Sequence, residues 1–217
     1  MKIICLILAR AGSRRIPNKN LLYFNKKPLI YWTLKQALRI NFISKIIVSS
    51  DSEKILSLTK KISKKFILNK RTKKFSGAKS KSETVIKYLH KIYKFDFTDF
   101  ILILQPTSPL RTDKDISRLL KICKNFNLKT LHSGNIYKKK IKIKKKINLF
   151  FSSNRKKIYS KKNFSYNGAI YLFNFGYFIK SNTIYEKKPN ILNMNTKNSL
   201  DIDYYEDIKN FNYKDFK

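Results

Sequence analysis

Three separate segments of this 217-residue chain concentrate the residue types that bind phosphate, orient a substrate or hold a metal. The first loop, residues 10–20, reads RAGSRRIPNKN and follows an apolar run. Gly12 allows close approach of the backbone to a ligand, Ser13 can donate a hydrogen bond, and cationic side chains neutralise phosphate. The loop therefore predicts a polyphosphate site, with a solvated basic loop as the alternative. Its cations are Arg10, Arg14, Arg15 and Lys19.

The first loop matches neither G-x-x-x-x-G-K-[ST] nor G-x-G-x-x-G, which disfavours those two nucleotide-binding families.

The second loop, residues 104–111, reads LQPTSPLR and follows another apolar run. Its two prolines restrict the backbone, so the Gln105 amide and the Ser108 hydroxyl can be held in fixed positions. Groups held in this way suit substrate orientation, and we expect both residues to bind a substrate. The alternative is a proline-rich turn whose hydroxyls only cap the next helix.

The acidic segment, residues 199–207, contains four of the 13 acidic residues of the chain. Asp201 and Asp203 are two positions apart, so in an extended backbone their side chains point to the same face. Two such carboxylates can hold magnesium together with phosphate oxygens. The alternative is an acidic cluster that favours the N-terminus of a last helix near residues 206–209.

The pattern of apolar residues predicts the elements that position these segments. Residues 3–8 and 100–104 are continuous apolar runs, typical of parallel strands buried on both faces, and we expect further strands at residues 45–49 and 66–68. Helices are expected at residues 28–39, after a cap at Asp51 or Ser52, at residues 82–94, and after the T-x-x-D signal of Thr112 and Asp115. This alternation predicts an α/β fold with a doubly wound, mostly parallel sheet and sites at the carboxyl ends of its strands.

The alternation ends near residue 133. Residues 138–146 read KKKIKIKKK, and strands are expected at residues 149–151 and 169–173 with no helix between them. We therefore expect a single domain over residues 1–217, with a small β-rich arm at about residues 134–166. In an extended backbone Ile141 and Ile143 share a face that the body or a partner would bury.

The composition excludes some classes of protein. The 49 Lys and Arg residues against 13 Asp and Glu give a formal charge of +36, yet 42% of the residues are hydrophobic, too many for a disordered chain. Lys, Ile, Asn, Phe and Tyr dominate, and because A/T-rich codons encode them, the charge is only partly a sign of a polyanionic partner. Cys5 and Cys123 lack metal-ligand spacing, which fits a reducing compartment, and no apolar run is long enough to span a bilayer. We expect a cytoplasmic protein that does not bind membranes.

Four motifs together resemble one enzyme family. ILARAGSRRIPNKN, LQPTSPLRT, NGAIYLF and DIDYYED, in this order, closely resemble the N-acylneuraminate cytidylyltransferases, which include the CMP-sialic acid synthetases and their pseudaminic and legionaminic acid relatives. The resemblance covers residues 1 to about 207. It implies a Rossmann-like α/β fold with a protruding dimerisation arm, hence a homodimer. It also implies magnesium-dependent transfer of CMP from CTP to the anomeric hydroxyl of a nonulosonic acid.

The same resemblance implies roles for individual residues. The CTP phosphates would be held by Arg10, Ser13, Lys19 and Asn20, and the cytosine and ribose by Arg71 and Ser82. Gln105 and Asn167 would face the sugar acid, and Asp201 and Asp203 would hold Mg²⁺. The expected catalytic residues are Arg10, Lys19 and Asp203. The chain departs from the family where Arg14 replaces a usual lysine and where residues 72–75 replace acidic residues and prolines.

Two other functions compete with this interpretation. A 3-deoxy-manno-octulosonate cytidylyltransferase would have a related first loop, although the second loop and the DID ending argue against it. A basic nucleic-acid-binding protein would use the charge together with the 13 tyrosines and 16 phenylalanines, but the lysines are spread over the whole chain and no nucleic-acid motif is present. No general base is evident, because His90 and His132 fit structural roles better.

Overall fold

The computed structural model describes residues 2–13, 15–77, 80–137, 147–150, 158–160 and 163–211. Within these ranges nine strands form one sheet in the order β5-β4-β1-β6-β10-β7-β11-β8-β9, and β2 with β3 forms a separate hairpin. The strands are β1 Ile3–Leu8, β2 Tyr23–Phe24, β3 Lys27–Pro28, β4 Lys45–Ser50, β5 Phe66–Lys70, β6 Phe100–Leu104, β7 Thr130–Tyr137, β8 Ile147–Phe150, β9 Ile158–Ser160, β10 Asn163–Asn174 and β11 Asn190–Asn193. The helices are α1 Leu29–Arg39, α2 Glu53–Ile62, α3 Ser82–Tyr93, α4 Asp113–Asn125, α5 Phe175–Ser181 and α6 Tyr205–Lys209, with 3-10 turns η1 Lys19–Leu21, η2 Lys73–Phe75 and η3 Thr196–Ser199.

The sheet is mostly parallel, as the apolar runs predict. β1 lies between β4 and β6 and pairs with both in parallel, and β5 extends this block beside β4. β10 is antiparallel to β6 and β7, after which β11 and β8 again run parallel to β7. β1 and β6 are buried on both faces, which explains why neither sequence alternates between apolar and polar residues.

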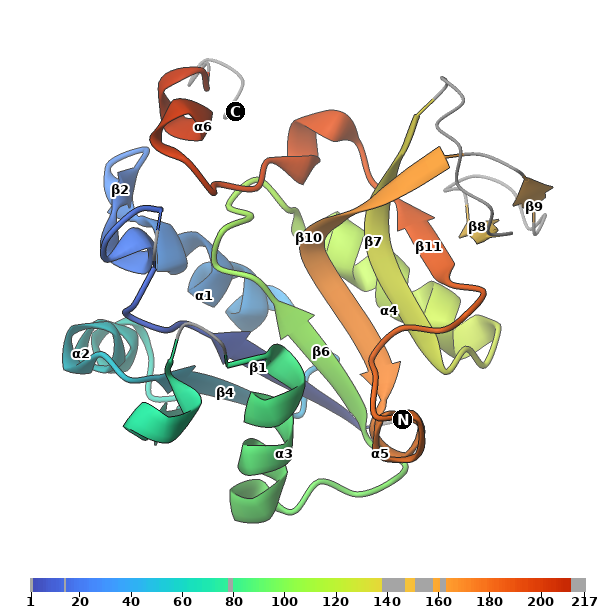
Figure 1. Cartoon of the computed structure of the whole chain (residues 1–217), viewed down its shortest axis with the longest axis horizontal. Helices are drawn as coiled ribbons and strands as arrows, with labels where there is room; N and C mark the ends of the chain where they lie inside the picture. The colour runs from blue at the N-terminus through green and yellow to red at the C-terminus, as the bar shows by residue number, and fades with distance from the viewer. Residues whose placement is uncertain are drawn as a thin grey trace.

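Helices cover both faces of the sheet, so the fold is the predicted α/β arrangement (Figure 1). Successive residues of β1 enter opposite cores: Cys5 and Ile7 pack with residues of α1, α2 and α4, whereas Ile4 and Leu6 pack with residues of α3 and α5. In Figure 1, α3 lies in front of the strands and α4 behind them. No helix in the described ranges is long and apolar enough to cross a membrane.

Local signals start several helices as predicted. The Ser52 hydroxyl accepts the N–H of Ile55 at the start of α2, and Thr112 with Asp115 forms a reciprocal capping box at the start of α4. Pro28 differs from the prediction. It precedes α1 as its cap and pairs with Tyr23 in the β2–β3 hairpin, so the helix begins one residue later.

Several elements of the C-terminal half, among them α5 and β11, were not predicted from the sequence. β7 and β10 form a long antiparallel pair from Thr130↔Phe173 to Tyr137↔Asn163, and the end of this pair falls within the residues predicted as an arm. Of the predicted strand at residues 149–151, β8 contains residues 149 and 150. Residues 138–146, with Ile141 and Ile143, and residues 151–157 lie outside the described ranges.

A third, smaller core joins the first loop to the end of the chain. Ile16, Phe24 and Ile202 are fully buried together with Leu29 of α1, and the rings of Phe24 and Phe211 are 5.0 Å apart. Figure 1 shows the C-terminal segment returning beside the β2–β3 hairpin. This packing holds the acidic segment against the first loop.

Candidate active site

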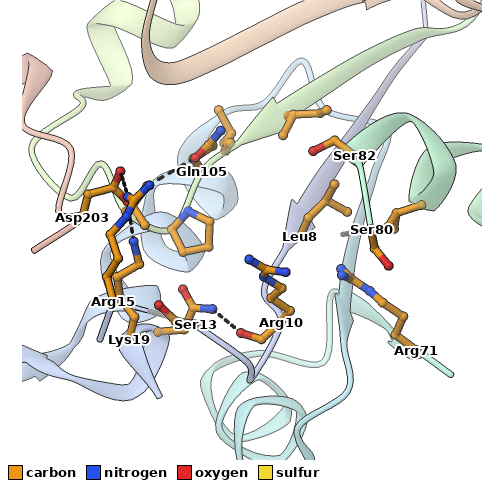
Figure 2. A pocket seen from close by; sticks show the side chains of 16 residues that line it. Leu8, Arg10, Ser13, Arg15, Lys19, Arg71, Ser80, Ser82, Gln105 and Asp203 are labelled. Atoms are coloured by element: carbon orange, nitrogen blue, oxygen red, sulfur yellow. Dashed lines mark hydrogen bonds and ion pairs between the residues drawn. The ribbon is translucent and has the colours of Figure 1, made fainter. Parts of the chain in front are cut away.

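A cavity of about 510 Å³ opens at the carboxyl ends of β1 and β6. This is where the chain order of the sheet reverses, from β1 toward β4 on one side and toward β6 on the other. Figure 2 shows Arg15, Lys19 and Asp203 on one side of the cavity and Arg71, Ser80 and Ser82 on the other. The walls are formed by Leu8, Arg10, Ser13, Arg15, Lys19, Asn20, Arg71, Ser80, Ser82, Val85, Ile103, Leu104, Gln105, Pro106, Thr107 and Asp203.

Asp203 is the acidic residue of this wall, and two cations of the first loop contact it. Lys19 Nζ donates to Asp203 Oδ1 at 2.7 Å and to the Ile202 carbonyl at 2.8 Å, and the Arg15 guanidinium donates to Asp203 Oδ2. Partial burial works to raise the pKa of Asp203, but the hydrogen bonds and charges of Lys19 and Arg15 outweigh it and hold that pKa below its usual value. Asp203 is therefore ionised at neutral pH.

Asp201 lies deeper than Asp203 and has a different environment. Burial raises the pKa of its carboxyl group, a hydrogen bond with Thr107 lowers it, and the charge of Asp203 raises it further. Asp201 Oδ1 is buried and has no hydrogen-bond partner among the described residues. The backbone N–H of Ile202, between the two aspartates, donates to the Thr107 carbonyl at 2.8 Å, which fastens the acidic segment to the second loop.

The first loop is fixed at both ends by polar contacts. The N–H of Ala11 donates to Asp51 Oδ1 at 2.7 Å, and the Asn20 amide donates to the Arg10 carbonyl at 2.9 Å. Arg10 Nη1 donates to the Gly77 carbonyl at 3.1 Å, which brings the segment before α3 to the cavity. Asp51 was predicted only as a possible helix cap; its contact with a residue 40 positions away was not predictable from local sequence.

Arg71 lies on the opposite wall, at the end of β5. Its guanidinium donates to the Ser49 hydroxyl at 3.2 Å and to the Ser49 carbonyl at 2.9 Å, and burial lowers its pKa from the usual value for arginine. Ser82, the first residue of α3, lines the same wall, as does Ser80, which the sequence analysis did not single out. The predicted Arg71–Ser82 pair is therefore brought together at the cavity.

A buried arginine holds the second loop in place. The Arg111 guanidinium donates to the carbonyls of Gln105 at 3.2 Å and Ala169 at 2.7 Å, and to the side chains of Thr33 at 2.9 Å and Gln36 at 2.8 Å. Its side chain is 1% exposed, and burial lowers its pKa to about 10. Arg111 thus fixes the position of Gln105, which lines the cavity. Arg111 belongs to the LQPTSPLRT motif, but its role in holding the loop was not predicted from the sequence.

Two predicted substrate residues do not line the cavity. Ser108 is fully buried, and its hydroxyl has no hydrogen-bond partner in the described structure. The Asn167 carbonyl oxygen accepts from the Ser133 hydroxyl at 2.6 Å, and its amide donates to Ser199 Oγ at 3.0 Å. Asn167 therefore ties β10 to β7 and to the 3-10 turn before the acidic segment.

The histidines and cysteines lie apart from the cavity walls. His132 is fully buried within β7, with its Nε2 2.8 Å from the Ile184 carbonyl, and burial lowers its pKa to about 4. His90 lies against Phe175, with ring centres 4.7 Å apart. Burial raises the pKa of Cys5 and of Cys123 to about 12, so neither thiol is a reactive nucleophile. These positions match the structural roles expected for both histidines.

The donor set at Asp201 and Asp203 suits a hard divalent cation, but it is incomplete. The unpartnered Asp201 Oδ1 is a free oxygen donor beside a second, ionised carboxylate. The described residues contain no group of three or more histidine, cysteine, aspartate or glutamate side chains that could hold a metal. A magnesium ion at this pair would need further oxygen ligands from a bound anion or from water.

Comparison with known proteins supports the resemblance seen in the sequence. A family model described as "Cytidylyltransferase" matches residues 4–214. The chain is 37% identical to an N-acylneuraminate cytidylyltransferase of Escherichia coli O18:K1:H7 over 121 residues, which are 56% of this chain and 28% of that protein. It is 35% identical to a CMP-N,N'-diacetyllegionaminic acid synthase of Legionella pneumophila over 125 residues, 57% of this chain and 54% of that protein. The matches thus span about half or less of the length of these curated relatives.

A solved structure shares the fold of this chain. A CMP:2-keto-3-deoxy-manno-octonic acid synthetase, solved in complex with CTP, aligns with a TM-score of 0.65 and 14% sequence identity, covering 97% of this chain and 96% of that one. At this level of identity the likeness establishes the fold alone.

Proposed function

Because the chain belongs to the cytidylyltransferase family, we propose that it transfers CMP from CTP to the anomeric hydroxyl of a sialic-acid-like nonulosonic acid and releases pyrophosphate. One observation carries this proposal. The cavity at the strand ends brings cations of the first loop, the amide-bearing second loop and the acidic segment to one place, although Lys19 and Asp203, which are in contact, are 184 positions apart in the sequence. Those are the three groups that nucleotidyl transfer needs: charge neutralisation, substrate orientation and carboxylates for a metal.

The cations of the first loop would hold the triphosphate. Arg10 and Lys19 are at the carboxyl end of β1, and their charges would neutralise the phosphate oxygens as the bond to pyrophosphate breaks. Ser13 and Asn20 lie beside them in the cavity wall and can donate hydrogen bonds to phosphate. Lys19 already contacts Asp203, so it would connect the phosphates to the acidic segment.

Asp201 and Asp203 would hold Mg²⁺ beside the triphosphate. The ion, when bound, would act as a Lewis acid toward phosphate oxygens and as a template for the two substrates. Asp203 would serve as the ionised ligand, since Lys19 and Arg15 keep its pKa low. The buried Asp201 would contribute its unpartnered oxygen.

The remaining predicted residues would bind the nucleoside of CTP and the sugar acid. Arg71 and Ser82 would contact the cytosine and ribose from the wall opposite Asp203 (Figure 2). Gln105, held by Arg111, would face the sugar acid with its side-chain amide. Ser108 and Asn167 would act through the packing of the second loop and of β10, because neither lines the cavity.

The proposed setting is a cytoplasmic homodimer in which the arm at residues 134–166 joins two copies. The antiparallel pair of β7 and β10, which continues to Tyr137 and Asn163, would form the base of this arm. Size-exclusion chromatography with light scattering tests this part of the proposal directly. A molecular mass that corresponds to a monomer would contradict the proposed homodimer.

A single assay tests the activity. Purified protein is incubated with CTP, Mg²⁺ and, separately, neuraminic, legionaminic, pseudaminic and 3-deoxy-manno-octulosonic acids, and pyrophosphate release is followed. We expect turnover with at least one nine-carbon acid and formation of its CMP conjugate by mass spectrometry. Turnover with the octulosonic acid alone would favour the alternative substrate class. No turnover with any acid, together with tight binding of single-stranded oligonucleotides, would favour the nucleic-acid alternative.

A further inference from the structure

Arg15 lies in the cavity wall, yet its guanidinium contacts the acidic segment. It donates to Asp203 Oδ2, and its Cζ lies 4.9 Å from the centre of the Tyr204 ring. The Arg15 side chain is 48% exposed, whereas the Lys19 side chain is 12% exposed and also donates to a backbone carbonyl. Because exposed ion pairs are weak, Arg15 can leave Asp203 at little cost, whereas Lys19 is held in place.

The two aspartates differ in how their charges are compensated. Asp203 has two cationic partners, and Asp201 forms no ion pair in the described part of the chain. Around the pair, the cavity wall also contains Arg10 and Arg71. Among the described residues that line the cavity, four cations face one carboxylate, that of Asp203. A divalent cation that arrives alone therefore meets repulsion and a carboxylate that is already occupied.

A triphosphate removes both obstacles. Its negative charges offset the positive charge of the cavity wall. Its oxygens supply the further metal ligands that the two carboxylates cannot provide. It also offers Arg15 a better partner, since a guanidinium binds phosphate with the same paired geometry that it uses for carboxylate, and phosphate has the higher charge.

We infer that Arg15 is a positioning residue that occupies Asp203 until a nucleotide triphosphate draws it away, so that a divalent cation binds this protein only together with nucleotide. The inference rests on the proposed function, from which it takes CTP as ligand and Asp201 with Asp203 as the metal pair. Arg15 here changes partner between two anions, and Tyr204 supports the guanidinium in the position without ligand.

The first test uses Mn²⁺ as a paramagnetic probe in the absence of nucleotide, with free Mn²⁺ measured by electron paramagnetic resonance. Wild-type protein should leave Mn²⁺ free, whereas Arg15→Gln should bind it at least about tenfold more tightly, because one repelling charge is gone and Asp203 is released. Adding Asp203→Asn to this variant should abolish the gain. The matched control is Arg39→Gln, which removes a similarly exposed arginine 3.5 Å from Asp113 and outside the cavity wall, and should behave as wild type.

The second test follows the exchange itself without any metal. The ¹⁵Nε resonance of Arg15, assigned by its loss in Arg15→Gln, should shift when CTP is added in the presence of EDTA. A resonance that CTP leaves unchanged overturns the inference, as does equal Mn²⁺ affinity of the wild type and Arg15→Gln without nucleotide.

Failure of the proposed function gives a different result. If the protein transfers CMP but its Mn²⁺ affinity does not depend on Arg15, the proposed function stands and the inference about Arg15 is wrong. If the protein shows the Arg15 effects but releases no pyrophosphate with any acid, the exchange of partners by Arg15 stands and the proposed activity is wrong.

Discussion

The carboxylate of Asp207 accepts the backbone N–H of Asp203 at 2.7 Å. The same oxygen accepts the N–H of Tyr204, the N-cap residue of α6, at 2.7 Å, and so satisfies a backbone donor at the start of that helix. One residue of the acidic segment therefore starts the helix, and another enters the cavity wall. The alternative that the acidic segment favours the start of a helix is therefore confirmed for Asp207. The prediction of a metal site concerns Asp203.

This division predicts different consequences for the acidic residues. Asp203→Asn removes the ionised carboxylate that Lys19 and Arg15 contact, and we expect turnover to fall on the order of a hundredfold or more, as for other preorganised electrostatic groups. Asp201→Asn should cause a similar loss. CTP binding, measured by calorimetry, should change much less in both variants because the first loop is intact.

Asp207→Asn is the matched comparison. It should lower the free energy of unfolding by about 1 kcal/mol through the weakened cap and reduce turnover far less than Asp203→Asn. Near-normal, magnesium-dependent turnover in both the Asp201 and Asp203 variants would remove the metal assignment.

Gly168 gives a second prediction, because its backbone is left-handed and a Cβ there would crowd the site. Its φ is +75°, and an added Cβ would lie 3.2 Å from Asp201 Oδ2. Gly168→Ala should therefore lower the free energy of unfolding by about 1–2 kcal/mol and displace the Asp201 carboxylate. Turnover should fall at least about tenfold, in keeping with the sensitivity of active sites to small displacements.

Gly12→Ala is the stability control for Gly168→Ala. Apart from its chain neighbours, no atom of the described residues lies within 4 Å of a Cβ built at Gly12, and the φ of Gly12 is not positive. Its free energy of unfolding should stay within about 0.5 kcal/mol of wild type. Equal stability and turnover in Gly168→Ala and wild type would show that the Asp201 carboxylate does not need its present position.

The sheet was largely predictable because its central strands follow local rules. Residues 3–8 and 100–104 are apolar throughout, since parallel strands in the middle of a sheet are buried on both faces. Thr112 and Asp115 cap a helix through contacts three residues apart, which a sequence displays directly. α5 escaped prediction because residues 175–179, FGYFI, are apolar or aromatic on all sides and contain a glycine, so no helical face stands out.

The site was predictable only where its chemistry lies within a motif. Asp203 and Lys19 could be chosen from residue type and family resemblance, but their contact joins residues 184 positions apart and depends on the buried Ile16 and Ile202. Arg15 and Arg111 belong to the same motifs as the chosen residues, and nothing local distinguishes a cation that pairs with an aspartate from one that holds a loop. Such roles arise only when the chain folds.

His132 predicts how stability depends on pH. Burial lowers its pKa to about 4 in the folded protein, whereas an unfolded chain protonates this residue near pH 6.5. The unfolded state therefore binds the proton first as pH falls, and stability is lost between about pH 6.5 and 4, by about 3 kcal/mol in total. Urea unfolding at pH 7 and pH 4 should show this loss in wild type and a smaller one in His132→Gln. Parallel pH profiles for the two proteins would contradict a buried neutral histidine.

Base recognition gives the last prediction, and thermal unfolding in the presence of nucleotides measures it. If Arg71 and Ser82 contact cytosine and ribose, CTP at about a hundredfold over its dissociation constant should add about 2.7 kcal/mol to stability, or about 5–10 °C in Tm for a chain of this size. ATP, GTP and UTP at the same concentration should raise Tm by several degrees less.

Arg71→Gln should lower the CTP shift to the level of the other nucleotides, because the triphosphate contacts of the first loop remain. Arg10→Gln should instead reduce the Tm shifts of all four nucleotides by similar amounts. Arg10 belongs to the first loop of the cavity wall, where the triphosphate would bind. Equal shifts with all four nucleotides in wild type would mean that this wall of the cavity binds phosphate without distinguishing the base.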